Sequence, residues 1–218
     1  MRPSQPRAHR VAAVILCGGA SSRMGTDKAV LDWNGAAAID RLAALSERLG
    51  LRMVLTAGAD HGLPAVFDAR PGEGPCGGIL AAAAWLSAAG YGRALILAVD
   101  APTVTADDIR PLMDAGGPGA AYDGLPLPMV IELAAIPAEA RANWALKRLV
   151  QAAGLSTLHC SDQARPRLRG ANTPEERRHL LSELQAAAPS SSGTRSPSPR
   201  DGGLHEPRAG SIRPQHHG

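Results

Sequence analysis

Short apolar runs alternate with segments of helical periodicity along most of this chain, and that alternation limits the possible folds more than any other feature. Runs that are apolar at consecutive positions are typical of strands covered on both faces. We predict strands at 11–16, 53–56, 65–67, 94–99, 129–133 and 156–159. Strands that alternate with helices predict an α/β fold, namely a three-layer α/β/α sandwich with a mostly parallel sheet.

The predicted helices lie between these strands and after the last of them. They cover 36–49, 78–89, 106–115, 139–153 and 174–187. Two have clear start signals: Thr105 precedes Asp108 by three residues, and Thr173 precedes Pro174 at the first helical position. Parallel sheets bind ligands at the carboxyl ends of their strands, so we expect functional residues in the loops that follow strands.

The composition changes near residue 186. From there to the end, Pro, Gly and Ser supply 16 of 33 residues, without hydrophobic periodicity. Such a segment buries too little apolar surface to offset the conformational entropy lost on folding. We therefore predict a disordered N-terminal arm at 1–9, one folded domain at 10–187, and a disordered tail rich in Pro, Gly, Ser and Arg at 188–218.

Charge and composition exclude several classes of function. The net charge is +3, but residues 11–185 carry 16 basic and 18 acidic residues, so the excess positive charge lies at the chain ends. An acidic body with six aromatic residues argues against nucleic-acid binding. No apolar run approaches the ~20 residues of a membrane span. Three scattered cysteines indicate neither a disulfide framework nor a zinc site, which favours a reducing cytoplasm.

The loop after the first predicted strand contains the most informative residues. Positions 16–28 read L-C-G-G-A-S-S-R-M-G-T-D-K. Gly18 and Gly19 permit close approach of an anion to the backbone, and Arg23 and Lys28 add positive charge. Lys28 is one of two lysines in the chain, so its place here indicates a phosphate-rich ligand. The spacing matches neither the P-loop nor the dinucleotide fingerprint, and a glycine-rich turn with solvated charges is the alternative.

This loop resembles the signature of the molybdenum cofactor guanylyltransferases, which are nucleotidyltransferases with a Rossmann-like sheet. The matching residues are Leu16, Gly18, Gly19, Ser21, Arg23, Met24, Gly25, Asp27 and Lys28, and Cys17 stands where the family usually has alanine. Four later stretches resemble the family in the same order: Asp68 with G-P-C-G-G at 74–78, A-V-D-A-P at 98–102, D-G-L-P-L-P-M at 123–129, and A-N-T-P-E-E at 171–176.

The resemblance implies a cytoplasmic, Mg²⁺-dependent enzyme that transfers GMP from GTP to the terminal phosphate of molybdopterin and releases pyrophosphate. It implies that Arg23, Lys28 and Asp100 are catalytic, with Asp100 also the metal ligand. The implied nucleotide-binding residues are Leu16, Cys17, Gly18, Gly19, Arg23, Lys28, Asp68 and Asp100. An acceptor that is itself a phosphate is already ionised, so no general base is required. Proteins of molybdoenzyme maturation are the implied partners, with no nucleic acid and no membrane.

The acceptor side matches the family less well. Leu125, Leu127 and Gly170 stand where the family has polar residues. We expect Asn172 to bind the acceptor, and we consider the Lys147–Arg148 pair as either a second acceptor contact or a solvated helix face. Two alternatives therefore stay open. One is a related nucleotidyltransferase that uses CTP or a different phosphate acceptor. The other is a catalytically weak nucleotide-binding protein whose arginine-bearing tail docks a partner.

Histidine and tryptophan are expected to contribute to the structure more than to the site. His61, His159 and His179 lie outside every motif, so we expect structural or surface roles for them. Trp33, Trp85 and Trp144 are expected in the core.

Overall fold

The structure, a computed structural model, describes residues 10–18, 27–67 and 74–187. Within these ranges seven strands form one sheet in the order β3-β2-β1-β4-β6-β5-β7. The strands are β1 (Val11–Leu16), β2 (Val54–Ala57), β3 (Ala65–Val66), β4 (Arg93–Ala98), β5 (Gly119–Tyr122), β6 (Leu125–Glu132) and β7 (Ser156–Leu158). Only β6 runs antiparallel to its neighbours, β4 and β5. The predicted α/β fold with a mostly parallel sheet is confirmed.

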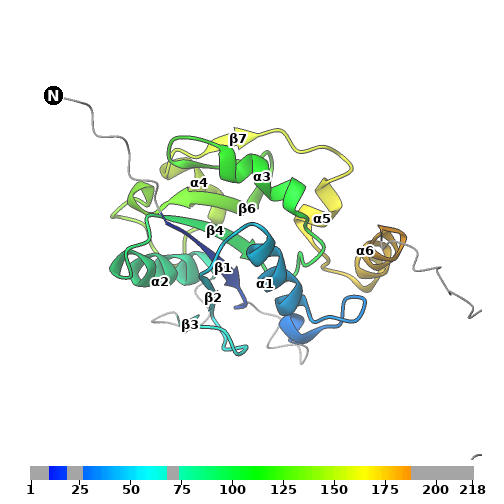
Figure 1. Ribbon diagram of the computed structural model, residues 1–218. Coiled ribbons are helices and arrows are strands. Elements are labelled where there is room, and N and C mark those ends of the chain that lie inside the picture. The colour runs from blue at the N-terminus through cyan, green and yellow to red at the C-terminus, as the bar shows by residue number, and fades with distance from the viewer. Residues whose placement is uncertain (1–9, 19–26, 68–73, 188–218) are drawn as a thin grey trace, which may run out of the picture. The chain divides into compact units, whose positions relative to one another are not determined.

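Six α-helices and two 3₁₀ turns lie between the strands or after the last of them in the described ranges (Figure 1). The helices are α1 (Ala38–Arg48), α2 (Pro75–Ala88), α3 (Ala106–Asp114), α4 (Leu146–Ala152), α5 (Arg165–Arg169) and α6 (Pro174–Ala187), and the 3₁₀ turns are η2 (Lys28–Val30) and η3 (Leu133–Ala135). None of the helices in these ranges is long and apolar enough to cross a membrane.

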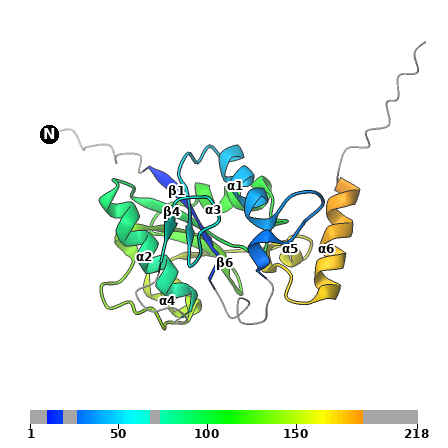
Figure 2. The same ribbon diagram turned by 90° about the horizontal axis from the view of Figure 1, so that it is seen from below.

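Side chains of the central strands alternate between two apolar cores, one on each face of the sheet. Ala13 and Ile15 of β1 pack in the core that α1 and α3 cover, whereas Val14 and Leu16 pack in the core that α2 and α4 cover. Figure 2 shows α1 and α3 on one side of the sheet and α2 and α4 on the other. Both faces are covered, which explains why β1 and β4 are apolar at consecutive positions.

One expectation about secondary structure is wrong, and two observed elements were not predicted. The helix predicted at 139–153 is confined to α4, because two successive turns precede it, with Ala140 N–H bonded to Pro137 O and Trp144 N–H to Arg141 O. These turns bury Trp144, which agrees with its expected place in the core. Trp85 was also expected in the core, but it is 42% exposed, so that expectation is wrong. Strand β5 and helix α5 were not predicted, because each is short and neither shows a clear periodic pattern.

Candidate functional site

Three side chains that are distant in sequence meet beyond the carboxyl ends of β1 and β4. The Nζ atom of Lys28 lies 3.6 Å from Oδ2 of Asp100 and 3.4 Å from Oδ1 of Asn172. The Lys28 and Asp100 side chains are 27% and 30% exposed, so a ligand can reach both. The fold thus brings together one residue from each of three separate sequence motifs, at the sheet edge where ligands of α/β proteins bind.

Lys28 is the first residue of the 3₁₀ turn η2, and Asp27 fixes that turn. The Asp27 carboxylate accepts a hydrogen bond of 2.9 Å from the backbone N–H of Ala29, whose side chain is buried. The imidazole Nε2 of His61 lies 3.7 Å from the other Asp27 oxygen. No sequence pattern indicates this contact, because His61 lies outside every motif. The expected structural role of His61 agrees with this position beside the turn.

Asp100 follows β4 and is held between Lys28 and the segment before α6. Burial raises the pKa of the Asp100 carboxyl above its ordinary value, and the positive charge of Lys28 opposes that shift. The backbone N–H of Ala171 donates to the Asp100 carbonyl at 2.9 Å. Gly170 makes this approach possible: it has φ +73°, and a Cβ there would lie 2.3 Å from the same carbonyl oxygen. The close contact between the backbones of Gly170 and Asp100 therefore explains why glycine stands here in place of the asparagine expected from the family resemblance.

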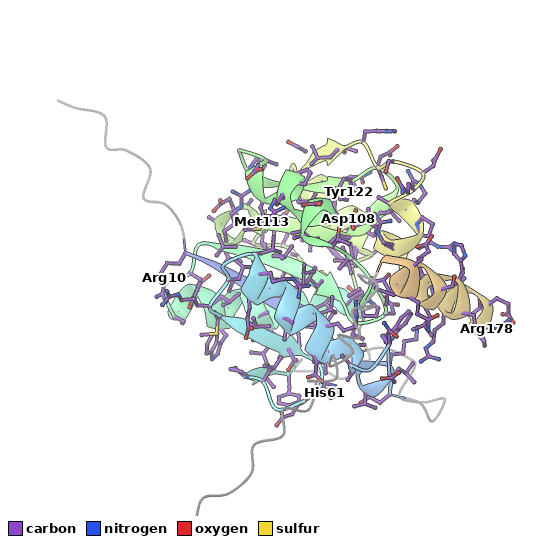
Figure 3. All side chains as sticks on the ribbon, turned by 45° about the vertical axis from the view of Figure 1, so that its right-hand side comes forward. Arg10, His61, Asp108, Met113, Tyr122 and Arg178 are labelled. Atoms are coloured by element: carbon purple, nitrogen blue, oxygen red, sulfur yellow. The ribbon has the colours of Figure 1, made fainter. Side chains whose placement is uncertain are left out.

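Helix α5 is anchored to α3 by a half-buried ion pair. Arg167 donates two hydrogen bonds to Asp108, at 2.9 and 3.2 Å. Burial alone would raise the pKa of Asp108, but the hydrogen bonds from Arg167 and Thr105 outweigh it and hold the pKa below its usual range. The Tyr122 hydroxyl donates to the Asp108 carbonyl at 2.6 Å, and Figure 3 shows the two residues side by side. This network positions the segment that leads to Asn172.

The predicted helix starts at Thr105 and Thr173 are both confirmed as capping boxes. Thr105 Oγ1 accepts from the N–H of Asp108, whose carboxylate accepts from the N–H of Thr105. At α6, the Glu176 carboxylate accepts from the backbone N–H groups of Asn172 and Thr173, and Thr173 Oγ1 accepts from the N–H of Glu176. The second box fixes the backbone of Asn172 beside Lys28.

The loop after β1 is described as far as Gly18, and it packs against the loop after β2. A Cβ on Gly58, which has φ +101°, would lie 2.7 Å from the Cα of Gly18, so glycine is required at this contact. Burial, with a smaller contribution from the Asp27 carboxylate, raises the pKa of the Cys17 thiol to about 12. Cys17 is therefore a neutral thiol, and Leu16 is buried in the core. Gly19, Arg23 and Asp68 lie outside the described residues.

A cavity of about 520 Å³, here called the α6 pocket, opens beside Lys28. Its polar and aromatic lining comes from Lys28, Asp100, Asn172, Trp33, Arg177 and Arg178. Neither of the two arginines was expected at the site, because both follow the last motif and lie on a helix with many charged residues. No sequence signal separates them from solvated arginines.

Lys147 and Arg148, the other two residues expected at the acceptor, lie elsewhere. They belong to α4, whose apolar residues pack in the same core as α2. The Arg148 guanidinium lies 3.9 Å from the ring centroid of Trp144. Neither residue lines the α6 pocket. Of the three expected acceptor residues, the fold brings only Asn172 to Lys28.

A family model for the MobA-like NTP transferase domain matches residues 13–187, which include every strand and helix that positions this site except the start of β1. The chain belongs to this family. This chain is 28% identical over 179 residues to a molybdenum cofactor guanylyltransferase of Xanthomonas euvesicatoria. The alignment covers 78% of this chain and 94% of that protein.

Two further comparisons concern a second relative and the fold. A molybdenum cofactor guanylyltransferase of Acidiphilium cryptum is 37% identical over 112 residues, and that alignment covers 48% of this MobA-like chain and 57% of the relative. The crystal structure of molybdopterin-guanine dinucleotide biosynthesis protein A from Archaeoglobus fulgidus superposes with a TM-score of 0.55 and 18% identity, over 80% of this chain and 99% of that one. This structural likeness shows a shared fold.

Proposed function

We propose that this MobA-like transferase moves GMP from GTP to the terminal phosphate of molybdopterin and releases pyrophosphate. The meeting of Lys28, Asp100 and Asn172 at the carboxyl edge of the sheet is the observation that carries the proposal. The guanylyltransferase names of the relatives from Xanthomonas and Acidiphilium support the choice of nucleotide and acceptor.

Lys28 has the central role in this reaction. The acceptor phosphate attacks the α-phosphorus of the nucleotide in line with the leaving pyrophosphate, so the site must align two anions and neutralise their charge. The ammonium group of Lys28 can neutralise this negative charge. It lies beside the Asp100 carboxylate and the Asn172 amide. The acceptor phosphate is ionised at neutral pH, so the attack needs no general base.

The nucleotide side of the proposal includes residues outside the described ranges. Gly18 and Gly19 would offer backbone N–H groups to the triphosphate, with the buried Leu16 and the partly buried Cys17 supporting that loop. Arg23 would share the phosphates with Lys28, and Asp68 would contact the guanosine. Of the acceptor residues, the proposal keeps Asn172. GTP as the donor places the reaction in the cytoplasm, and molybdoenzyme-maturation proteins would receive the product.

The residues present fit a Mg²⁺ ion at Asp100. No group of three or more potential metal-ligating side chains occurs in the described part of the chain, and Asp100 is the carboxylate of the α6 pocket. Mg²⁺ commonly binds one or two carboxylates and keeps waters and substrate phosphate oxygens as its other ligands. When bound, the ion would neutralise charge on the transferring phosphate. Asp100 would hold it, next to the Lys28 ammonium group.

Replacing Asp100 with Asn tests this role. The amide keeps the size of the side chain but loses its charge, so we expect weaker Mg²⁺ binding, lower activity and partial recovery at high Mg²⁺. The measurement is a Mg²⁺ titration of transfer activity for Asp100→Asn and the unmodified protein. Superimposable titration curves would remove Asp100 as the metal ligand.

Pyrophosphate release tests the proposed function as a whole. Each of the four nucleoside triphosphates is supplied with and without molybdopterin, and we expect release only with GTP and molybdopterin together. Release with CTP in place of GTP would indicate the related cytidylyl reaction. No release with any nucleotide, while GTP still binds, would instead support a nucleotide-binding protein without transferase activity.

A further inference from the structure

Arg177 is the arginine of α6 that pairs with no carboxylate among the described residues. Each of three neighbouring arginines has an acidic partner: Arg167 pairs with Asp108, Arg169 with Glu176, and Arg178 with Glu175. The guanidinium of Arg177 instead donates through one terminal nitrogen to the backbone carbonyl of Asp32. Within the described residues, its charge is therefore not balanced by an acid.

The side chain of Arg177 is also held in place. Its guanidinium carbon lies 5.3 Å from the ring centroid of Trp33, a residue that is 3% exposed. Its Nε atom is buried and has no hydrogen-bond partner in the described structure. A buried donor without a partner lowers stability. Arginine stacks on aromatic rings and binds phosphate through several N–H donors, so Arg177, held against Trp33 with an unused donor, is suited to an anionic ligand.

The α6 pocket beside this arginine has the charge that suits an anionic ligand. Arg177 lines the pocket together with Lys28 and Arg178, and Asp100 supplies its opposing carboxylate. Figure 2 shows the segment between η2 and α1 facing α6, which agrees with the contacts of Arg177 with Asp32 and Trp33. More positive than negative groups border the cavity, and arginine binds phosphate oxygens in a bidentate manner.

The position of the pocket distinguishes the acceptor from the nucleotide. Its described lining comes from the η2 region, the end of β4 and residues 171–178, and includes nothing from β2, β3 or α2. The loop after β1, which would bind the nucleotide and is here called the nucleotide loop, includes Gly18. Gly18 contacts Gly58 on the side of β1 where β2 lies. Lys28 borders the pocket and follows the nucleotide loop, so it can face both substrates.

We propose that Arg177 binds the phosphate of the acceptor in the α6 pocket and thereby helps to select a phosphorylated acceptor. This inference rests on the proposed function for the identity of the reaction. The phosphate would occupy the space between Arg177 and Lys28, with Asn172 beside it. Arg177 would supply on α6 a polar acceptor contact that Leu125, Leu127 and Gly170 cannot offer through their side chains.

Kinetics of the full-length chain test the proposal. The variants are Arg177→Gln, which removes the charge, and the control Arg110→Gln, whose arginine lies exposed on α3 and pairs with Asp107. Loss of a charge-assisted phosphate contact should raise KM for molybdopterin about 10- to 100-fold in Arg177→Gln, with KM for GTP within about twofold. Arg110→Gln should match the unmodified protein. An equal rise in both KM values, or none, would overturn the assignment.

A binding measurement separates this inference from the proposed function. Inorganic phosphate is titrated calorimetrically into each protein saturated with a non-hydrolysable GTP analogue, so that no transfer is required. We expect about 10-fold weaker phosphate binding in Arg177→Gln than in Arg110→Gln. The same contrast in a protein that transfers no GMP to molybdopterin would retain the phosphate site and reject the proposed reaction. Equal affinities, or no phosphate binding by the unmodified protein, would reject the site.

A second variant covers the case in which Arg177→Gln does not fold. Arg177→Lys keeps the positive charge but lacks the planar fork that binds phosphate through two nitrogens. Its phosphate affinity should fall between those of the unmodified protein and Arg177→Gln, or clearly below the unmodified value if the glutamine variant is unfolded. Unchanged phosphate affinity in Arg177→Lys would overturn the bidentate contact.

Discussion

Replacing Gly170 with alanine should disrupt the site from the backbone, without removing any side chain that contacts a ligand. The new Cβ would lie 2.3 Å from the Asp100 carbonyl oxygen and 2.9 Å from the N of Ala101. Ordinary carbon–oxygen contact requires the segment 170–172 or the Asp100 backbone to move by about 1 Å. Movement of the segment 170–172 would separate Asn172 from Lys28, and movement of the Asp100 backbone would separate Asp100 from Lys28.

The size of the effect follows from this displacement. A misplacement of about 1 Å in a site that aligns two substrates costs on the order of 100-fold in rate. The strained backbone adds a loss of stability of about 1–3 kcal/mol, because φ is +73° at this position. We therefore expect Gly170→Ala to lower kcat/KM for GMP transfer about 100-fold and to lower the melting temperature.

Gly50→Ala is the control for a glycine that has positive φ but makes no close contact. Gly50 has φ +79°, close to that of Gly170, but no atom lies within 4 Å of the position of its Cβ. The control should lose about 1 kcal/mol of stability and keep its activity. Transfer kinetics and thermal unfolding of the two variants are compared directly. Activity of Gly170→Ala within threefold of the control would refute the argument that contact with Asp100 positions Asn172.

Three further predictions follow from the site, the α3–α5 ion pair and the tail. Lys28→Ala should lower kcat/KM about 30- to 1,000-fold, because a phosphate contact worth roughly 2–4 kcal/mol at the transition state is lost, while the melting temperature should change little; activity within threefold would remove Lys28 from the mechanism. Asp108→Asn should lower the free energy of unfolding at pH 7 by about 2–4 kcal/mol. The folded-state pKa of Asp108 is depressed, so its stabilisation is present above the unfolded-state pKa of about 4 and is lost as the pH falls through the folded-state pKa. Denaturant unfolding from pH 7 to pH 3 should therefore show the two proteins converging in acid, and a constant difference would contradict this assignment. Truncation after Ala187 should leave kcat/KM for GTP within about twofold, because every motif ends by Glu176; a tenfold fall with an unchanged circular dichroism spectrum would move the predicted domain boundary.

Local sequence patterns predicted most of the elements that frame the site. Consecutive apolar residues mark β1 and β4 because both faces of the central sheet are covered. Each capping box joins residues that are close in sequence, Thr105 with Asp108 and Thr173 with Glu176. Both helix starts could therefore be recognised without knowledge of the fold. The position of Lys28 after β1 and of Asp100 after β4 placed both at the carboxyl edge of the sheet.

Two short elements, β5 and α5, were missed for different reasons. Strand β5 reads Gly-Ala-Ala-Tyr, which is too short and too small to show a strand pattern. It pairs closely with β6, where a Cβ on Gly119 would lie 2.0 Å from the carbonyl oxygen of Val130. Helix α5 has five residues and is held by the Arg167–Asp108 pair, whose members are 59 positions apart. The Arg167–Asp108 pair leaves no local signal, whereas the Asp123-Gly124 turn that joins β5 to β6 is a local hairpin signal that the strand prediction did not use.

The sequence by itself determined the α/β class, the strands that precede Lys28 and Asp100, and the helix starts, because these depend on apolar periodicity and on contacts between near neighbours. The tertiary structure decided which polar residues share a site. It brought Asn172 to Lys28 across 144 positions, explained Gly170 by its contact with Asp100, placed Arg177 and left Lys147 and Arg148 outside the α6 pocket. Arginines on solvated and ligand-facing helix surfaces follow the same local pattern, and only the packing of η2, β4 and α6 around one cavity distinguishes them.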